Sequence, residues 1–324
     1  MKIERLALLL CCTLFGSTGL AQAPPSDGPR AALRSLVENV TSATGRRYGT
    51  QDSDGQSMDT AKIIADPAGG YLAVYHTYSS GEPHVTVATS ADLINWTRRA
   101  NLGARTSQPT IAAVSDGGFV VAWEQEPSNH LAFRYYRDRG ALLGGVAARS
   151  FDAPRTLSQC AEGTPNIYSV TLSPDIDHSS IDVGAHYYAN CDRDRQQRGR
   201  LTNFHSWQAS KQDLFDNALL YWNVAGNIGD RDAFWFGGFQ YGLIEGQYTG
   251  GDFGSWRTFV YDYQTGNADR LSIHTDRGST AFANPSATIL TGPNGQPTIV
   301  VSVFIPGEGA APGEGGQLIY YRSL

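Results

Sequence analysis

The chain has 324 residues, and its 25 Lys and Arg against 31 Asp and Glu give a net charge of −6. This acidic balance argues against binding to nucleic acid or to an anionic membrane, because both attract basic surfaces. Charged residues make up only 17% of the chain, whereas it contains 36 Gly, 16 Tyr and 13 Phe. Aromatic residues favour pleated sheets and glycine favours tight turns, so the composition predicts an all-β protein and excludes a coiled coil or a helical bundle.

The first segment has the features of an export signal. Lys2 and Arg5 precede an apolar run over residues 6–15, and Ala21-Gln22-Ala23 offers a small-residue cleavage site. Ten apolar residues are too few for a stable membrane anchor, which needs about 20. We therefore expect a signal peptide over residues 1–23 and a secreted or periplasmic protein with no membrane partner.

Residues 24–57 form an extension before the main domain. Apolar residues at helical spacing predict a short helix in its first half, at Leu33, Leu36, Val37 and Val40. The rest of the extension is polar and is expected to be irregular. The main domain is then expected over residues 58–324.

A unit of about fifty residues occurs five times in this domain. Each unit has a strand with a polar start, a turn rich in Gly, Asp or Pro, a more apolar strand and, in most units, a third strand. Antiparallel meanders repeated at this period predict a five-bladed β-propeller. A β-sandwich is the alternative, although it does not require a repeat. The units can be aligned on Ala61, Pro109, Pro165, Ala233 and Pro285.

Two cysteines, Cys160 and Cys191, remain after removal of the signal. They flank two predicted strands, 164–173 and 180–190, at equal distances from the turn between them. A hairpin folded at that turn brings the two sulfurs together, so we expect a disulfide. A metal pair is the alternative, but no third ligand follows at a useful spacing. We expect no metal site and no cofactor, and leave open a structural cation in the central channel.

In a propeller the first strand of each blade lines the central channel, and the polar residues at its start gather at one mouth. Carboxylate, amide and hydroxyl groups suit a polyhydroxylated ligand, because each sugar hydroxyl both donates and accepts hydrogen bonds. The expected partner is therefore a polysaccharide or oligosaccharide, bound by a monomer; the alternative is that the groups bond only to one another and to water. This first column contains Asp59, Gln108, Thr164, Asn166, Asp230, Asp232 and Asn284.

A second column of polar residues falls within the apolar middle strands. A charged side chain inside a sheet is costly unless it is paired or functional, so these residues are site candidates; alternatively they point outward or pair with one another. Trp235, like Trp96 and Trp256, could stack on a sugar ring or pack in the core. The second column contains His76, Glu124, His186, Glu245 and Ser302.

One segment carries a family resemblance. Ser90, Asp92, Leu93 and Trp96 form an S-x-D-L-x-x-W pattern, which resembles the pattern common in five-bladed glycosidases such as glycoside hydrolase family 43. We expect Ser90 and Asp92 to close a turn that Trp96 anchors. The resemblance implies a five-bladed propeller over about residues 58–324. It also implies a mechanism with an Asp base, an Asp that tunes the pKa of its neighbours and a Glu acid.

Carried over by position, the resemblance makes Asp59 the base. The tuning Asp falls at Asn166, which removes the expected charge, and the acid falls near Asp230 or Asp232. Glu162, in Glu-Gly-Thr-Pro, looks like the acid motif of the family but stands one blade early. The candidate acids are therefore Glu162, Asp232 and Glu245.

These patterns predict an exported glycoside hydrolase that acts on a polysaccharide, one containing arabinose or xylose. Hydrolysis needs one carboxyl group that donates a proton to the glycosidic oxygen and one that is ionised. The main alternative is a carbohydrate-binding propeller without turnover. A polysaccharide lyase, which would need a Tyr and a His at the site, is a further alternative supported only by His186, Tyr187 and Tyr188.

Overall fold

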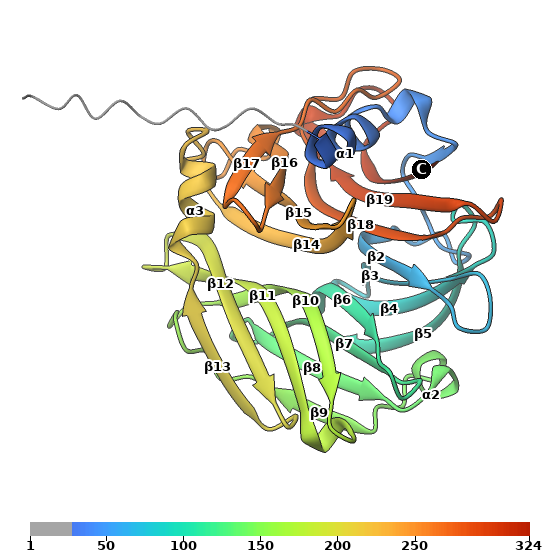
Figure 1. The fold of residues 1–324 in the computed structure, drawn as a ribbon, viewed down its shortest axis with the longest axis vertical. Coiled ribbons are helices and arrows are strands. Elements are labelled where there is room, and N and C mark those ends of the chain that lie inside the picture. The colour runs from blue at the N-terminus through green and yellow to red at the C-terminus, as the bar shows by residue number, and fades with distance from the viewer. Residues whose placement is uncertain (1–27) are drawn as a thin grey trace, which may run out of the picture.

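Figure 1 shows the computed structural model of the chain, which describes residues 28–324. The predicted signal peptide, residues 1–23, lies outside this range. Within residues 28–324 the strands form five antiparallel sheets of four strands each. Their innermost strands contact one another in the ring order β2, β6, β10, β14 and β18. The all-β prediction and the five-bladed β-propeller are therefore confirmed.

Each of the first three blades is one continuous meander, with strands added from the channel outward. The first blade contains β2 (Asp59–Ala65), β3 (Tyr71–Ser79), β4 (Glu82–Ser90) and β5 (Thr97–Ala104). The second contains β6 (Thr106–Ala113), β7 (Phe119–Gln125), β8 (His130–Tyr136) and β9 (Arg149–Asp152). The third contains β10 (Glu162–Leu172), β11 (Ser179–Ala189), β12 (Arg193–Thr202) and β13 (Ser206–Lys211).

The fifth blade closes the ring with a strand from the other end of the chain. Its outer strand β1 (Gly45–Arg47) belongs to the segment that the sequence analysis placed before the propeller, and it pairs with β20. The fourth blade contains β14 (Ile228–Phe236), β15 (Phe239–Gln247), β16 (Trp256–Asp262) and β17 (Asn267–Arg270). The fifth contains β18 (Ala283–Thr291), β19 (Pro297–Ile305), β20 (Gly316–Ser323) and β1.

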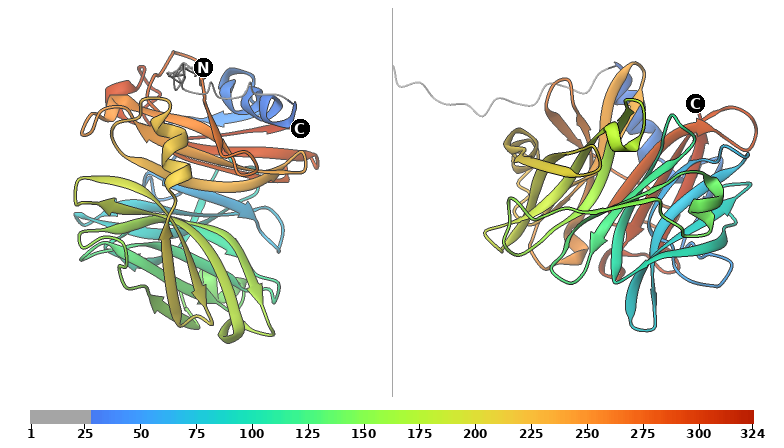
Figure 2. Two further views of the ribbon diagram at one scale, coloured as in Figure 1. Left: turned by 60° about the vertical axis from the view of Figure 1, so that its left-hand side comes forward. Right: turned by 90° about the horizontal axis from the view of Figure 1, so that it is seen from below.

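The helices lie outside the sheets, and α1 confirms the predicted N-terminal helix. Figure 2 shows α1 (blue) beside the orange and red strands of the fourth and fifth blades. Within residues 28–324, no helix has both the length and the apolar character that crossing a membrane requires. The helices are α1 (Gly28–Glu38), α2 (Arg139–Leu143) and α3 (Asp213–Leu220), with 3-10 turns at η1 (Val40–Ser42), η2 (Ile176–His178), η3 (Phe253–Ser255) and η4 (Gly307–Gly309).

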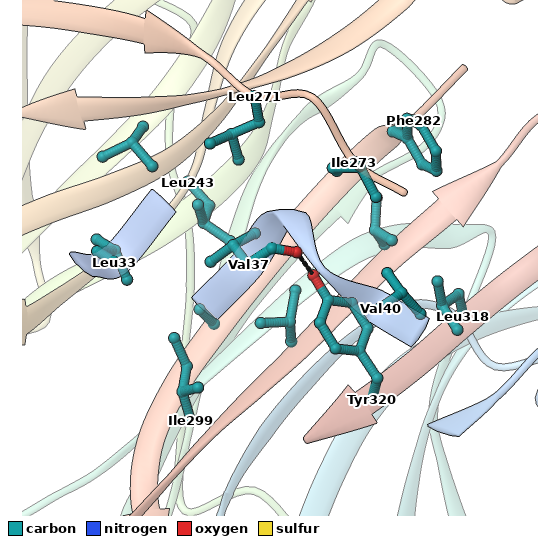
Figure 3. Close-up of a cluster of buried hydrophobic side chains, with 14 of the residues drawn as sticks. Leu33, Val37, Val40, Leu243, Leu271, Ile273, Phe282, Ile299, Leu318 and Tyr320 are labelled. Carbon is teal, nitrogen blue, oxygen red and sulfur yellow. Dashed lines mark hydrogen bonds between the residues drawn. The ribbon is translucent and has the colours of Figure 1, made fainter. Parts of the chain in front are cut away.

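Helix α1 packs against the hydrophobic core shared by the fourth and fifth blades. Leu33 and Val37, one helical turn apart, are both fully buried. Figure 3 shows them packed among side chains of β15, β19 and β20, including Leu243 and Ile299. The hydroxyl of Tyr320 donates a hydrogen bond of 2.6 Å to the carbonyl of Val37. The extension is thus part of the propeller core.

Two local predictions are confirmed by the hydrogen bonds around them. Ser90 Oγ accepts the backbone N–H of Leu93 at 2.9 Å, and Asp92 Oδ1 accepts that of Asn95 at 2.8 Å, while Trp96 is only 3% exposed. The S-x-D-L-x-x-W segment is therefore a closed turn anchored in the core. The predicted disulfide joins Cys160 to Cys191, with their Cα atoms 5.6 Å apart.

The start of every inner strand is irregular, and this repeated feature shapes the channel mouth. The register of each inner strand against its neighbour slips there, for example between Asp59 and Lys62 on β2. In four blades the slip contains a non-glycine residue with positive φ, a conformation that costs energy and persists only where its surroundings impose it. These residues are Thr60 (56°), Gln108 (54°), Thr164 (54°) and Asn284 (49°).

Candidate functional site

Because of these register shifts, one residue on the second strand of each blade pairs with a residue that precedes the shift on the inner strand. These second-strand residues form a ring at the channel mouth. Four members of the predicted second column belong to this ring. Ser302 does not: it pairs with Ser286 one step further along the channel, its hydroxyl accepts a hydrogen bond from Gln317, and Phe304 takes its place in the ring. The facing pairs are Asp59–His76, Ser107–Glu124, Gly163–His186, Gly229–Glu245 and Ala283–Phe304.

Two cavities adjoin at this mouth. The aromatic-lined cavity has a volume of about 190 Å³, and the polar cavity a volume of about 220 Å³. They share Thr164, His186 and Asp194, which therefore form their border. The aromatic-lined cavity is completed by Gln108, Glu245, Phe253, Trp256, Ala283, Asn284, Phe304 and Pro306. The polar cavity is completed by Glu124, Asn129, Ala161, Gly163 and Tyr188.

Two glycines let side chains of one blade enter the next. A Cβ atom at Gly163 would lie 2.0 Å from Glu124 Oε2, and one at Gly229 would lie 1.7 Å from His186 Nε2. Real Cβ atoms do not approach other atoms so closely, so a larger residue at either position would force Glu124 or His186 to move. The positions of Glu124 and His186 are therefore set by the backbone of the following blade.

Glu124 and Glu245 are held in parallel ways. The carboxylate of Glu124 accepts hydrogen bonds from the side chain of Asn129 and from the backbone N–H of Thr164. That of Glu245 accepts the backbone N–H of Asn284. Burial raises the pKa of both carboxyl groups, while these N–H groups and the charge of Arg231 oppose that rise.

Arg231 is a central residue of the mouth that the sequence analysis missed. It is 9% exposed, and its Nε lies 3.9 Å from Glu245 Oε1. Its charge acts on the titratable ring members of four blades, so the guanidinium lies among them. Its position in the sequence, between Asp230 and Asp232 at the start of the fourth inner strand, is the signal that could have identified it.

The two ring histidines are neutral at physiological pH. Burial, together with the charge of Arg231, lowers the pKa of His76 to about 4 and that of His186 to about 3. The Nδ1 atom of His76 lies 2.9 Å from Thr60 Oγ1. His186 Nε2 is buried and finds no hydrogen-bond partner within the described part of the chain.

Asp194 on β12 is a carboxyl group of the mouth that can carry a proton near neutral pH. Burial and the negative charges of Glu124 and Glu245 raise its pKa to about 7. One of its oxygens lies 3.9 Å from His186 Nδ1. Asp194 is not predicted from the sequence, because it lies among charged residues at the start of a third strand, where no single acid stands out.

Several predicted site residues lie at the mouth or next to it. Gln108 and Asn284 line the aromatic-lined cavity, and Gln108 Oε1 is buried without a hydrogen-bond partner among residues 28–324. Asp59 starts β2 and accepts a hydrogen bond from the hydroxyl of Ser57, and burial raises its pKa. Asp59 is not among the residues lining the two cavities.

Asp232 and Asn166 lie one step further along the channel, and both are 1% exposed. Asp232 forms an ion pair with Lys62 and accepts hydrogen bonds from Ser286 Oγ (2.9 Å) and the backbone N–H of Ala287 (2.8 Å). The carboxylate of Asp232 therefore links the first, fourth and fifth blades. The backbone of Asp230 pairs with that of Ile244, and its side chain lies outside the described part of the structure.

Glu162 and Trp235 do not line either cavity, although the neighbours of Glu162, Ala161 and Gly163, line the polar one. Glu162 Oε1 accepts three backbone N–H groups, those of Thr156 (2.6 Å), Leu157 (2.5 Å) and Ser158 (3.0 Å), so its carboxylate anchors the preceding loop. Trp235 is 65% exposed and pairs with Gln240, next to the turn at the far end of β14. Neither position supports the catalytic role expected of Glu162 or the stacking role expected of Trp235.

Among residues 28–324, no group of three or more His, Cys, Asp or Glu side chains is arranged to hold a metal ion. The mouth instead combines carboxyl groups, neutral imidazoles, one guanidinium and aromatic rings. This set can exchange protons and bind neutral polar molecules.

No protein-family model matches this sequence, and a search of curated proteins also found no match. Solved structures do share its fold. One titled a glycoside hydrolase has a TM-score of 0.61 at 9% identity, covering 91% of this chain and 94% of its own. An α-L-arabinofuranosidase from Podospora anserina in complex with cellotriose has a TM-score of 0.53 at 11% identity, covering 89% and 97%.

An α-L-arabinanase from Cellvibrio cellulosa complexed with arabinohexaose has a TM-score of 0.52 at 12% identity, covering 82% of this chain and 91% of its own. At identities this low, the likeness concerns the fold. The chain is therefore a five-bladed β-propeller of the architecture that these glycoside hydrolases share.

Proposed function

We propose that this protein is an exported glycoside hydrolase that cleaves a neutral polysaccharide containing arabinose or xylose, without a cofactor. The observation that carries the proposal is the position of Asp194. It lies on the border of two adjoining cavities, and its pKa is raised to about 7 by burial and by Glu124 and Glu245. A protonated carboxyl group beside ionised ones is the arrangement that glycosidic hydrolysis requires.

In this proposal Asp194 is the general acid. A sugar in each cavity would place the glycosidic oxygen at their border, where Asp194 donates its proton to the leaving group. Glu245 is assigned as the partner that activates water in its ionised form, because it lines the aromatic-lined cavity and because Arg231, within 3.9 Å, favours that form against the effect of burial. Asp59, the base by family resemblance, is assigned no direct role because it does not line either cavity.

Three further observations support this function: the fold, the disulfide and the charge of the mouth. The neighbours in fold are titled as an arabinofuranosidase and an arabinanase, and one is complexed with arabinohexaose. The disulfide between Cys160 and Cys191 suits an oxidising compartment outside the cytoplasm. Neutral sugars suit a mouth that holds several carboxyl groups, because these would repel a uronate.

The test is release of reducing sugar from a panel of arabinans, arabinoxylans and xylans. We expect the unaltered protein to release sugar from at least one polymer, and Asp194→Asn and Glu245→Gln each to lower kcat by about 100-fold or more. Asp59→Asn is the matched control and should stay within a few-fold of the unaltered protein. Full activity in Asp194→Asn would remove the acid assignment, and loss of activity in Asp59→Asn alone would restore Asp59 as the base.

A carbohydrate-binding propeller without turnover is the second candidate. The observation that favours it is the contact of Arg231 with Glu245, because a carboxylate stabilised by a guanidinium is a weaker base toward water. Binding of an oligosaccharide with no sugar release from any polymer would decide for it. The lyase alternative retains His186 and Tyr188 in the polar cavity, but Glu124 and Asp194 lie there too and oppose a uronate.

A further inference from the structure

The aromatic-lined cavity has an exposed phenylalanine at its rim. Phe253 lies on the loop between β15 and β16 and is 55% exposed, although it lines the cavity together with Trp256. Exposed single apolar residues are common, but an exposed aromatic ring at the edge of a polar cavity is a surface on which a ligand can be buried. Phe253 has no part in the proton chemistry proposed above.

The loop that carries Phe253 is braced by its own hydrogen bonds. Asp252 Oδ1 accepts the backbone N–H of Gly254 at 2.9 Å, and Ser255 Oγ donates to the carbonyl of Asp252 at 2.7 Å. Gln247 Nε2 donates to the same carbonyl at 3.2 Å. The 3-10 turn η3 also contacts η4 of the fifth blade. The ring is therefore held at the rim by a fixed turn.

The lining of this cavity is divided by chemistry. Phe253, Trp256, Phe304 and Pro306 supply apolar surface from the fourth and fifth blades, whereas Gln108, Asp194 and other polar groups come mostly from the second to fourth blades. A sugar ring has the matching division: C–H groups on its faces and hydroxyls around its edge. Aromatic side chains bury the first, and amide and carboxyl groups bond to the second.

The charges around Phe253 select the kind of ring. Asp252 precedes it in the chain, Glu308 lies beside Gly254, and Glu245 lines the same cavity. The guanidinium of Arg257, which donates to the carbonyl of Gly254 at 2.9 Å, and that of Arg231 near Glu245 offset part of this negative charge. Because the acidic groups outnumber these cations, a ring with a carboxylate is bound less well than a neutral ring.

We propose that Phe253 is a stacking platform that binds a neutral sugar ring of an extended chain at the rim of the aromatic-lined cavity. This inference rests on the carbohydrate function proposed above and adds a specificity-determining residue to it. The platform therefore favours longer ligands, because an oligosaccharide too short to reach the rim makes no contact with Phe253.

The experiment is calorimetric titration with arabinohexaose, xylohexaose and cellohexaose, and with hexagalacturonate as the charged probe. We expect Phe253→Ala to weaken binding of the preferred neutral hexasaccharide by about tenfold, and Phe253→Tyr to restore it. Phe253→Leu keeps apolar volume without a flat face and should not restore it. Phe239→Ala, an exposed phenylalanine at the other end of β15, is the matched control and should bind like the unaltered protein.

Three outcomes would overturn the platform alone: unchanged binding by Phe253→Ala, full rescue by Phe253→Leu, or equally tight binding of hexagalacturonate. If the unaltered protein binds none of the neutral hexasaccharides, the platform and the carbohydrate function both fail. If binding changes as expected but no polymer is cleaved, the platform stands and the hydrolase assignment fails.

Discussion

Replacement of Asp194 by Asn should change the stability of the protein in a pH-dependent way, independently of any substrate. Burial and two neighbouring carboxylates raise the pKa of Asp194 from 3.8 to about 7 in the folded protein. Ionising this group therefore costs free energy in the folded state that it does not cost in the unfolded chain. The cost is absent below pH 4, grows between pH 4 and pH 7, and is constant above pH 7. Asn carries no charge and removes it.

The size of the effect follows from the two pKa values. A rise from 3.8 to about 7 corresponds to about 4 kcal/mol of unfolding free energy at high pH. The side chain of Asp194 keeps 30% of its surface exposed, and solvent screening reduces this figure. We therefore expect Asp194→Asn to be about 2 kcal/mol more stable than the unaltered protein at pH 8 and equally stable at pH 4.

Urea unfolding at pH 4, 5.5, 7 and 8.5 measures this difference, provided that both proteins unfold with the same dependence on urea. Asp177→Asn is a control of opposite sign, because Arg149 lowers the pKa of the exposed Asp177. That variant should lose a little stability above pH 4. A stability difference for Asp194→Asn that does not vary with pH, or a less stable Asn variant at pH 8, would refute the reasoning.

Two further predictions concern how the mouth is held. Replacing Cys160 and Cys191 by Ser removes a crosslink between residues 31 positions apart in the sequence. This should lower the free energy of unfolding, measured by chemical denaturation, by about 3–4 kcal/mol. An unchanged denaturation midpoint would show that the crosslink restricts the unfolded chain little. Gly229→Ala would bring a Cβ atom against His186 and should cost about 1–3 kcal/mol, whereas Gly250→Ala, where a Cβ meets nothing within 4 Å, should be neutral. Equal effects of the two glycine variants on thermal unfolding would contradict the close approach.

The sequence predicts the ring because both of its signals are local. A polar residue at the start of each inner strand and a titratable residue inside four of the five apolar middle strands are visible without knowledge of the fold, and the repeat places them at equivalent positions. Glu124 and Glu245 are identified in this way. Closure of the ring by β1 is not visible, because a three-residue strand pairs with β20 at the other end of the chain.

Three residues show which spatial information a sequence pattern does not contain. Trp235 is five residues beyond Asp230 on the same strand, which at about 3.3 Å per residue puts it roughly 17 Å from the mouth. Glu162 fits an acid motif by its neighbours in sequence, but three N–H groups of the preceding loop fix its carboxylate there. Phe253 lies in a loop whose position depends on η4 in another blade. In each case the sequence does not show where the side chain lies in three dimensions.

Burial and the charge distribution together explain why the proton near neutral pH belongs to a carboxyl group and not to a histidine. Burial and Arg231 make both ring imidazoles poor bases, with pKa values of about 4 and 3. The same guanidinium favours the ionised forms of Glu124 and Glu245. Their negative charges then help to raise the pKa of Asp194. Burial is the larger cause of that rise, and together these effects leave a proton near neutral pH on the residue at the border of the two cavities, where the proposed function places the oxygen that bridges two sugars.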